Sequence, residues 1–129
     1  MPYPADYRYT KEHEWIKADD GVATIGITTY AQDSLGDIVF VELPKVGSDI
    51  TAGKTFGTVE SVKAVSDLYA PATGTVIEVN PDLATEPEKI NKDAHSAWLV
   101  KVKLKDANEL NSLLSAADYE QFVAEEGGH

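Results

Sequence analysis

The chain has 129 residues, which predicts a single domain over residues 1–129 with a hydrophobic core large enough to need no disulfide staples. It contains no cysteine, and this excludes a disulfide framework, a thiolate nucleophile and a thiol-based metal site. The net charge of −11 argues against binding to nucleic acid or to anionic membrane surfaces, and it fits a soluble protein that meets basic patches on partner proteins.

Two strands are predicted near the start of the chain. Residues 9–16 have the pattern of a strand, whose alternation would put Glu12 and Glu14 on one face. Residues 19–21, Asp-Asp-Gly, are a turn signal, and residues 22–27 have the composition of a second strand. Together these segments predict an N-terminal hairpin.

A short helix and an apolar strand come next. Residues 28–35 predict the helix, because Thr29 and Gln32 have the spacing of a capping box and Gly36 suits the position just after a helix. Residues 38–43 are strongly apolar and predict a strand, which Pro44 ends.

The centre of the chain predicts a hairpin with Lys63 at or near its tip. Residues 54–61 and 65–70 are β-prone and flank this lysine. No Asn-Gly or Asp-Gly pair specifies the turn, and Val62 and Ala64 are apolar where a solvated tip is normally polar. Lys63 is therefore either an ordinary solvated lysine or a lysine that another protein must recognise.

The second half of the chain predicts two more strands and a helical tail. Residues 75–80 and 97–104 alternate as strands, and the Pro- and Asn-containing segment 81–94 between them is predicted to be mostly loop. After residue 106 the apolar residues recur at helical spacing, which predicts two short helices broken near Ser115 or one bent helix. Many short strands with helices only as trim predict a mainly β fold, an antiparallel sandwich or flattened barrel.

No constellation for catalysis or metal binding can be assembled from the sequence. Residues 48–55 come close to a phosphate-binding loop, but a serine replaces the first glycine and a strand pattern, not a helix, follows. His13, His95 and His129 have no ligand spacing, so no metal site is predicted. Nor does any Ser-His-Asp pattern or G-x-S-x-G motif occur, so we expect no enzyme.

The hairpin contains the motif Glu60-Ser61-Val62-Lys63-Ala64, followed by Ser66-Asp67 and Pro71. This motif is similar to the lipoyl-lysine motif of the glycine cleavage system H-protein family, and the resemblance extends over nearly the full length. One stretch, residues 93–97, departs from the Pro-Tyr and Gly-Trp combination usual in the family. The other motifs that carry the resemblance are residues 13–15, 23–28, 31–33, 35–36, 39–44, 74 and 76–80 with Pro87, Asn91 and Trp98.

The resemblance implies a flattened barrel-sandwich hybrid of the lipoyl/biotinyl-carrier type with short helices, including the C-terminal helical tail. It implies lipoate in amide linkage on Lys63, and it disfavours biotin, since biotin carriers place methionines beside their lysine. It further implies that Glu14 and Asp67 receive the end of the arm in a cleft. Glu12, which stands where some members carry a serine, either adds to that cleft or points to solvent. By residue type alone, all three carboxylates are solvated side chains.

The function implied is that of a carrier, not an enzyme. In the family, a PLP-dependent glycine decarboxylase loads an aminomethyl group onto the arm. A tetrahydrofolate-dependent aminomethyltransferase unloads it, and dihydrolipoamide dehydrogenase reoxidises the dithiol. A lipoate ligase or lipoyl transferase must attach the arm. A lipoate relay protein and an unmodified interaction module remain as alternatives.

The sequence gives weaker indications of location. No apolar run approaches the roughly 18 residues that a membrane span needs, and residues 1–6 have the pattern of neither a signal peptide nor a transit peptide. We expect a bacterial cytoplasmic protein, or a mitochondrial matrix protein if this is a processed eukaryotic form.

Overall fold

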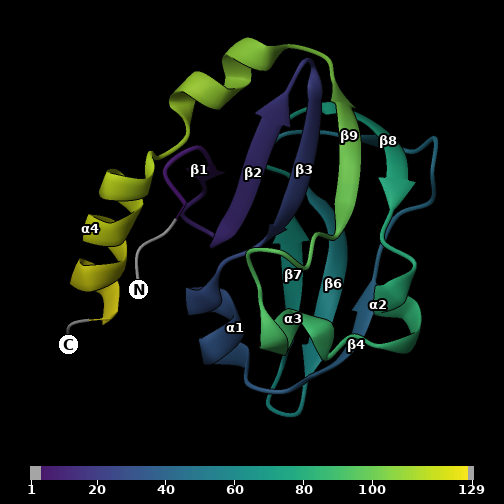
Figure 1. The fold of residues 1–129 in the computed structure, drawn as a ribbon, viewed down its shortest axis with the longest axis vertical. Coiled ribbons are helices and arrows are strands. Elements are labelled where there is room, and N and C mark those ends of the chain that lie inside the picture. Colours follow the sequence, from purple (N-terminus) through teal and green to yellow (C-terminus); the bar gives the residue numbers. More distant parts are fainter. Residues whose placement is uncertain (1–3, 128–129) are drawn as a thin grey trace.

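The computed structural model describes residues 4–127 and has two antiparallel β-sheets with helices at their margins (Figure 1). The strands are β1 Arg8–Tyr9, β2 Glu14–Asp19, β3 Val22–Ile27, β4 Ile38–Glu42, β5 Asp49–Ile50, β6 Thr55–Ser61, β7 Val65–Tyr69, β8 Gly74–Val79 and β9 Val100–Leu104. The helical segments are α1 Thr29–Leu35, α2 Asp82–Thr85, α3 Lys89–Lys92, the 3₁₀ segment η1 Ala107–Ser112 and α4 Ala116–Gly127.

The two sheets pack into one hydrophobic core. Within residues 4–127, six strands form one sheet in the order β1-β2-β3-β9-β8-β5, and three form the other in the order β4-β6-β7. Buried side chains from the larger sheet, such as Ile25 and Val100, belong to the same cluster as Val59 and Leu68 from the smaller one. The sheets remain unclosed, so the fold is a sandwich of mainly antiparallel strands and the predicted fold class is confirmed.

The predicted strand over residues 9–16 is wrong. The chain forms the short β1, turns, and then forms β2, with Tyr9 paired to Trp15 across the two strands. His13 takes a φ of 72° at this turn, a backbone conformation that non-glycine residues seldom adopt and that the sequence did not signal. Glu12 therefore lies in an exposed turn and Glu14 is buried in β2, so the two carboxylates do not share a strand face.

The helix over residues 28–35 is confirmed, with one difference at its start. The cap is Thr28, not Thr29, because the Thr28 hydroxyl accepts the N–H of Ala31. Gly36 ends the helix with a φ of 77°, as its predicted place after the helix requires.

The predicted loop over residues 81–94 is wrong in part, because it contains α2 and α3. Each is four residues long and begins without a side-chain cap, at Pro81 and Glu88. Single helical turns of this kind carry little periodic signal, and the proline is tolerated because a helix start needs no N–H there.

The C-terminal tail breaks near Ser115 into η1 and α4, as predicted. It is fastened to the start of the chain by two backbone hydrogen bonds of 2.9 Å between Tyr9 and Leu114. The Tyr119 ring stacks on Tyr9 at 4.8 Å, and its hydroxyl lies 2.7 Å from both His13 Nδ1 and Thr28 Oγ1. The tail is thus part of the folded body.

We predict that Tyr119→Phe lowers the free energy of unfolding by about 1–2 kcal/mol, because the fully buried Thr28 hydroxyl loses a partner while the ring stacking remains. Urea unfolding at neutral pH measures this difference as a lower midpoint with an unchanged slope. A midpoint equal to that of the wild type would show that the hydroxyl does not hold the tail.

Candidate functional site

Lys63 lies exposed at the tip of the β6–β7 hairpin, the teal turn at the bottom of Figure 1. Ser61 shapes this turn: its hydroxyl accepts the N–H groups of Lys63 and Ala64, each at 3.1 Å, and its own N–H donates to the Ala64 carbonyl at 2.8 Å. A serine side chain that binds nearby backbone donors can replace the Asn-Gly pair of a tight turn. The tip is therefore ordered by Ser61.

The linker between α1 and β4 contacts the tip and supports it. The Val62 N–H donates to the Asp37 carbonyl at 3.0 Å. The Lys63 side chain runs past Gly36, where an added Cβ would stand 3.4 Å from Lys63 Cε and 3.9 Å from Lys63 Nζ. The lysine stem therefore rests against backbone at the end of α1 and leaves its amine at the surface.

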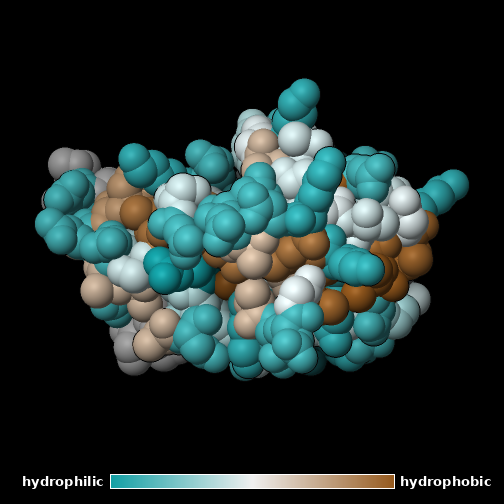
Figure 2. Space-filling model, turned by 90° about the horizontal axis from the view of Figure 1, so that it is seen from above, coloured by the Kyte–Doolittle hydropathy of each residue, from teal (hydrophilic) through white to brown (hydrophobic). Residues whose placement is uncertain are grey.

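Apolar side chains surround the tip. The face opposite the tip is mostly hydrophilic, with hydrophobic residues exposed in places (Figure 2). Among the described residues, Val62 is the most exposed large hydrophobic at 66%, and Val65 and the more distant Val46 follow at 63% each. Phe40 in β4 is also half exposed, and Glu60 pairs with both Phe40 and Val65, so the three side chains form one row across the smaller sheet. An apolar surface beside a charged lysine is suited to contact with another protein.

Glu14 is almost fully buried and connects the two sheets. Its Oε1 accepts the Thr10 hydroxyl at 2.6 Å, and its Oε2 accepts the N–H of Tyr69 in β7 at 3.1 Å. Desolvation by burial raises the pKa of Glu14 from 4.5 to about 7, although the bonds from Thr10 and Tyr69 oppose that rise. This carboxyl therefore changes charge near neutral pH.

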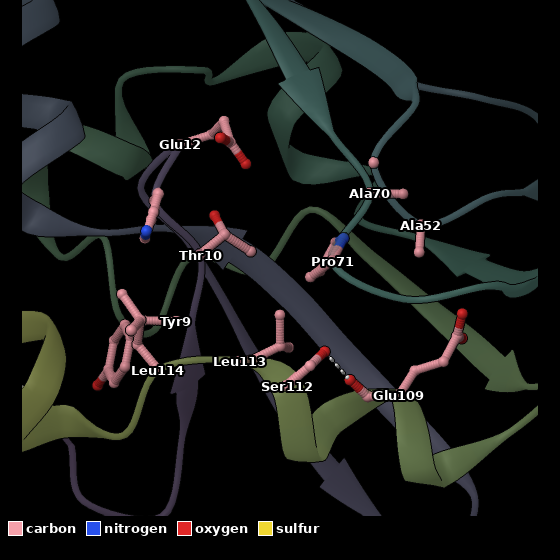
Figure 3. Close-up of a pocket in the computed structure, with 12 residues that line it drawn as sticks. Tyr9, Thr10, Glu12, Ala52, Ala70, Pro71, Glu109, Ser112, Leu113 and Leu114 are labelled. Atoms are coloured by element: carbon pink, nitrogen blue, oxygen red, sulfur yellow. Dashed lines mark hydrogen bonds between the residues drawn. The ribbon is translucent and has the colours of Figure 1, made fainter.

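Asp67 and Glu12 are both exposed, on different elements. Asp67 lies in the edge strand β7, opposite Thr58 and two residues before Tyr69. Glu12 lines a groove of about 320 Å³, together with Thr10, the hydroxyl partner of Glu14. Glu12 and Glu109 stand at opposite ends of this groove (Figure 3).

Glu14, in β2, is thus bonded to β7, the strand that contains Asp67, while Glu12 lies in the turn before β2. Two residues that support the site were not indicated by any spacing in the sequence. Thr10 holds Glu14, and Asn91 holds the α1–β4 linker beside Lys63 by accepting from Ile38 N–H and donating to the Gly36 carbonyl. Neither Thr10 nor Asn91 could be linked to the site by spacing, although the family resemblance includes Asn91. In residues 4–127 no three His, Asp or Glu side chains gather into a group that could hold a metal ion.

A β sandwich that holds one lysine out on a hairpin, with apolar neighbours, has the architecture of a carrier protein. Comparison with known proteins supports this class. The profile of the Glycine cleavage H-protein family matches residues 7–126. The chain belongs to this family, whose members are lipoyl carriers and not enzymes.

Individual relatives agree over the whole length. The chain is 69% identical to the glycine cleavage system H protein of Koribacter versatilis (strain Ellin345) and 67% identical to that of Acidobacterium capsulatum, with 100% of both chains covered in each case. It is 39% identical to the glycine cleavage system H protein in a crystal structure from Mycobacterium marinum. That likeness has a TM-score of 0.86 and covers 97% of this chain and 99% of the other. No helix in residues 4–127 is long and apolar enough to cross a membrane.

The raised pKa of Glu14 predicts a pH dependence of stability. The folded state holds the proton more tightly than the unfolded chain, so this stabilisation is complete below about pH 4.5 and is lost as the pH rises through about 7. We expect the wild type to lose up to about 3 kcal/mol relative to Glu14→Gln over this range. The glutamine mimics the neutral acid, since its amide can donate to Thr10 Oγ1 while its oxygen accepts from Tyr69 N–H.

Urea unfolding of both proteins at about pH 5 and about pH 8 measures the difference. Other titrating groups are common to the two proteins and cancel. A difference that does not change with pH would contradict the raised pKa.

Proposed function

We propose that Lys63 carries lipoate in amide linkage and that the chain serves the glycine cleavage system as its lipoyl carrier. The observation that supports this most directly is the exposed Lys63 amine on an ordered hairpin tip. Lys63 makes no ion pair within the described residues 4–127, so no carboxylate has to be displaced before the amine can react.

The residues around Lys63 fit such a group. Gly36 leaves backbone, not a side chain, beside the lysine stem. Val62 and Ala64 flank the lysine where biotin carriers have methionines, which favours lipoate over biotin. When attached, lipoate supplies a disulfide that can accept a glycine-derived aminomethyl group and be regenerated by oxidation. Acylation also removes the positive charge of the lysine from the tip.

The apolar tip supports contact with several partner enzymes. Phe40, Val62 and Val65 offer a surface that each partner can cover when it binds Lys63. We propose that these partners are a lipoate ligase or lipoyl transferase, a PLP-dependent glycine decarboxylase, a tetrahydrofolate-dependent aminomethyltransferase and dihydrolipoamide dehydrogenase. The strongly negative net charge of −11 favours partners with basic surfaces.

We further propose that Glu14 and Asp67 receive the cationic end of the loaded arm. Ionised Glu14 can accept a hydrogen bond beyond those from Thr10 and Tyr69, because each carboxylate oxygen has two lone pairs. A cation nearby lowers the pKa of Glu14 and so favours the charged acceptor. Asp67, exposed on the same β7 edge, adds a second negative charge. Glu12 acts on Glu14 electrostatically, since desolvation by burial and, to a lesser degree, the negative charge of Glu12 raise the pKa of Glu14. Glu12 is exposed, however, and lines the groove beside Thr10.

As to organisation and location, we propose that residues 1–129 form a single lipoyl-carrier domain. The relatives compared above are bacterial, which supports a cytoplasmic location.

We predict that expression with lipoate and a lipoate ligase raises the intact mass of the wild type by one lipoyl group and leaves Lys63→Arg unchanged. Arginine keeps the charge but cannot form the amide. Lys54→Arg is the matched control, since Lys54 is an exposed lysine at the other end of the same hairpin and should not affect lipoylation. An unmodified wild type would favour an interaction module without the cofactor. A lipoylated protein that fails to support glycine decarboxylation with purified partners would favour a lipoate relay.

We predict that Glu14→Gln and Asp67→Asn leave the attachment of lipoate unchanged but increase the rate at which the loaded carrier releases ammonia by about 10-fold, because each removes one charge-assisted acceptor. Glu12→Gln is the comparison that tests its own role. A rate equal to the wild type for Glu12→Gln would place Glu12 outside the cleft, and equal rates for all three variants and the wild type would remove the cleft from the mechanism.

A further inference from the structure

One amide side chain forms hydrogen bonds to both ends of the α1–β4 linker, which lies beside Lys63. Asn91, in α3, donates from Nδ2 to the Gly36 carbonyl at 2.8 Å, and its Oδ1 accepts the Ile38 N–H at 2.8 Å. Asp37 lies between these two residues, and its carbonyl accepts the Val62 N–H at 3.0 Å. Two hydrogen bonds therefore join Asn91 to the linker, and a third joins Asp37 in the linker to Val62, the residue before Lys63.

The linker backbone also forms the seat of the lysine stem. Gly36 takes a φ of 77° and donates its N–H to the Gln32 carbonyl, so its position is set by the end of α1. An added Cβ there would stand 3.4 Å from Lys63 Cε and 3.8 Å from Lys63 Cδ. A shift of Gly36 would therefore move the surface on which the lysine rests.

The hydrogen bonds inside the hairpin shape the turn, whereas those of the linker connect the turn to the rest of the protein. Ser61 binds Lys63 N–H, Ala64 N–H and the Ala64 carbonyl, and this gives the turn its shape. These bonds are local to the tip and do not orient it relative to the body of the protein. The pairing of β4 with β6 is irregular between Phe40 and Ile38, and it resumes where Ile38, the residue that ends the linker, pairs with Ser61. Beyond this last pair, the Val62 N–H bond to the Asp37 carbonyl joins the tip to the body of the protein, so the linker contributes to the orientation of the tip.

We propose that Asn91 is a positioning residue for Lys63: by joining Gly36 to Ile38 it fixes the linker that holds Val62 and seats the lysine stem. An enzyme that acylates Lys63 must bind the tip in one geometry, and a tip that is already in that geometry loses less conformational freedom on binding. This inference rests on the proposed function only in so far as Lys63 is the residue that is acylated.

The fold provides a matched control in Asn80. Its Nδ2 donates to the Trp98 carbonyl at 2.8 Å and its Oδ1 accepts the Asp82 N–H at 3.1 Å, so it also joins a carbonyl to an N–H. Neither bond involves the linker or the hairpin. Asn91→Ala and Asn80→Ala should therefore cost similar stability, and only Asn91→Ala should disturb the tip.

The first measurement is amide hydrogen exchange in the unlipoylated protein. We expect the exchange of Val62 N–H to be about 10-fold faster in Asn91→Ala than in the wild type and in Asn80→Ala, because its acceptor is no longer held in place. This result does not depend on any enzyme. Equal exchange at Val62 in the two variants would overturn the positioning role.

The second measurement is lipoate attachment by a lipoate ligase, with KM for the carrier separated from kcat. We expect KM to rise about 10-fold in Asn91→Ala and to be unchanged in Asn80→Ala. The rate at which a small acetylating reagent modifies Lys63 should be the same in all three proteins, because the amine is exposed in any case. A ligase KM equal to that of the wild type would overturn the inference.

The outcomes separate this inference from the proposed function. No attachment to the wild type would contradict the proposed function, while the exchange result would still decide the role of Asn91. If Asn91→Ala does not fold, Asn91→Asp replaces it. Asn91→Asp keeps an acceptor for Ile38 N–H and loses only the donation to Gly36, and it should still speed the exchange of Val62.

Discussion

The two-sided pairing of β6 is the constraint on which the rest of the site depends. This strand pairs with β4 along one edge and with β7 along the other, and it buries Phe56 and Val59 against the larger sheet. Gly57 lets the Glu42 carbonyl approach to a place where a Cβ would stand 2.5 Å away, so the base of the hairpin is tightly packed. Because the base is anchored in the core, the tip can expose apolar side chains and a lysine without support from a core of its own.

Burial of Glu14 places a carboxyl group with a raised pKa next to strand β7 of the hairpin. A carboxyl is seldom buried unless it is partnered, and here Thr10 and the Tyr69 N–H are the partners. The remaining cost of burying a charge appears as a pKa of about 7. Groups of this kind are common at functional sites, since they can change charge with small changes in their surroundings.

Much of this architecture could be predicted from local pattern, and the exceptions have physical causes. The lysine hairpin and the end of α1 at Gly36 were predictable because strand alternation and helix-end glycines act locally. The turn before β2 was not, because His13 adopts a positive φ that no local pattern signals, and its side chain contacts Tyr119, 106 residues away. The burial of Glu14 was equally hidden, since its partner in β7 is 55 residues distant and carboxylates are usually solvated.

The exposure of Lys63 has a practical consequence for anyone who handles the protein. Its charge faces solvent and makes no ion pair within residues 4–127, so loss of that charge is not masked by a neighbouring group. One acylation changes the formal net charge from −11 to about −12 at an exterior position. Native electrophoresis or anion-exchange chromatography should therefore resolve a mixed preparation into its two populations.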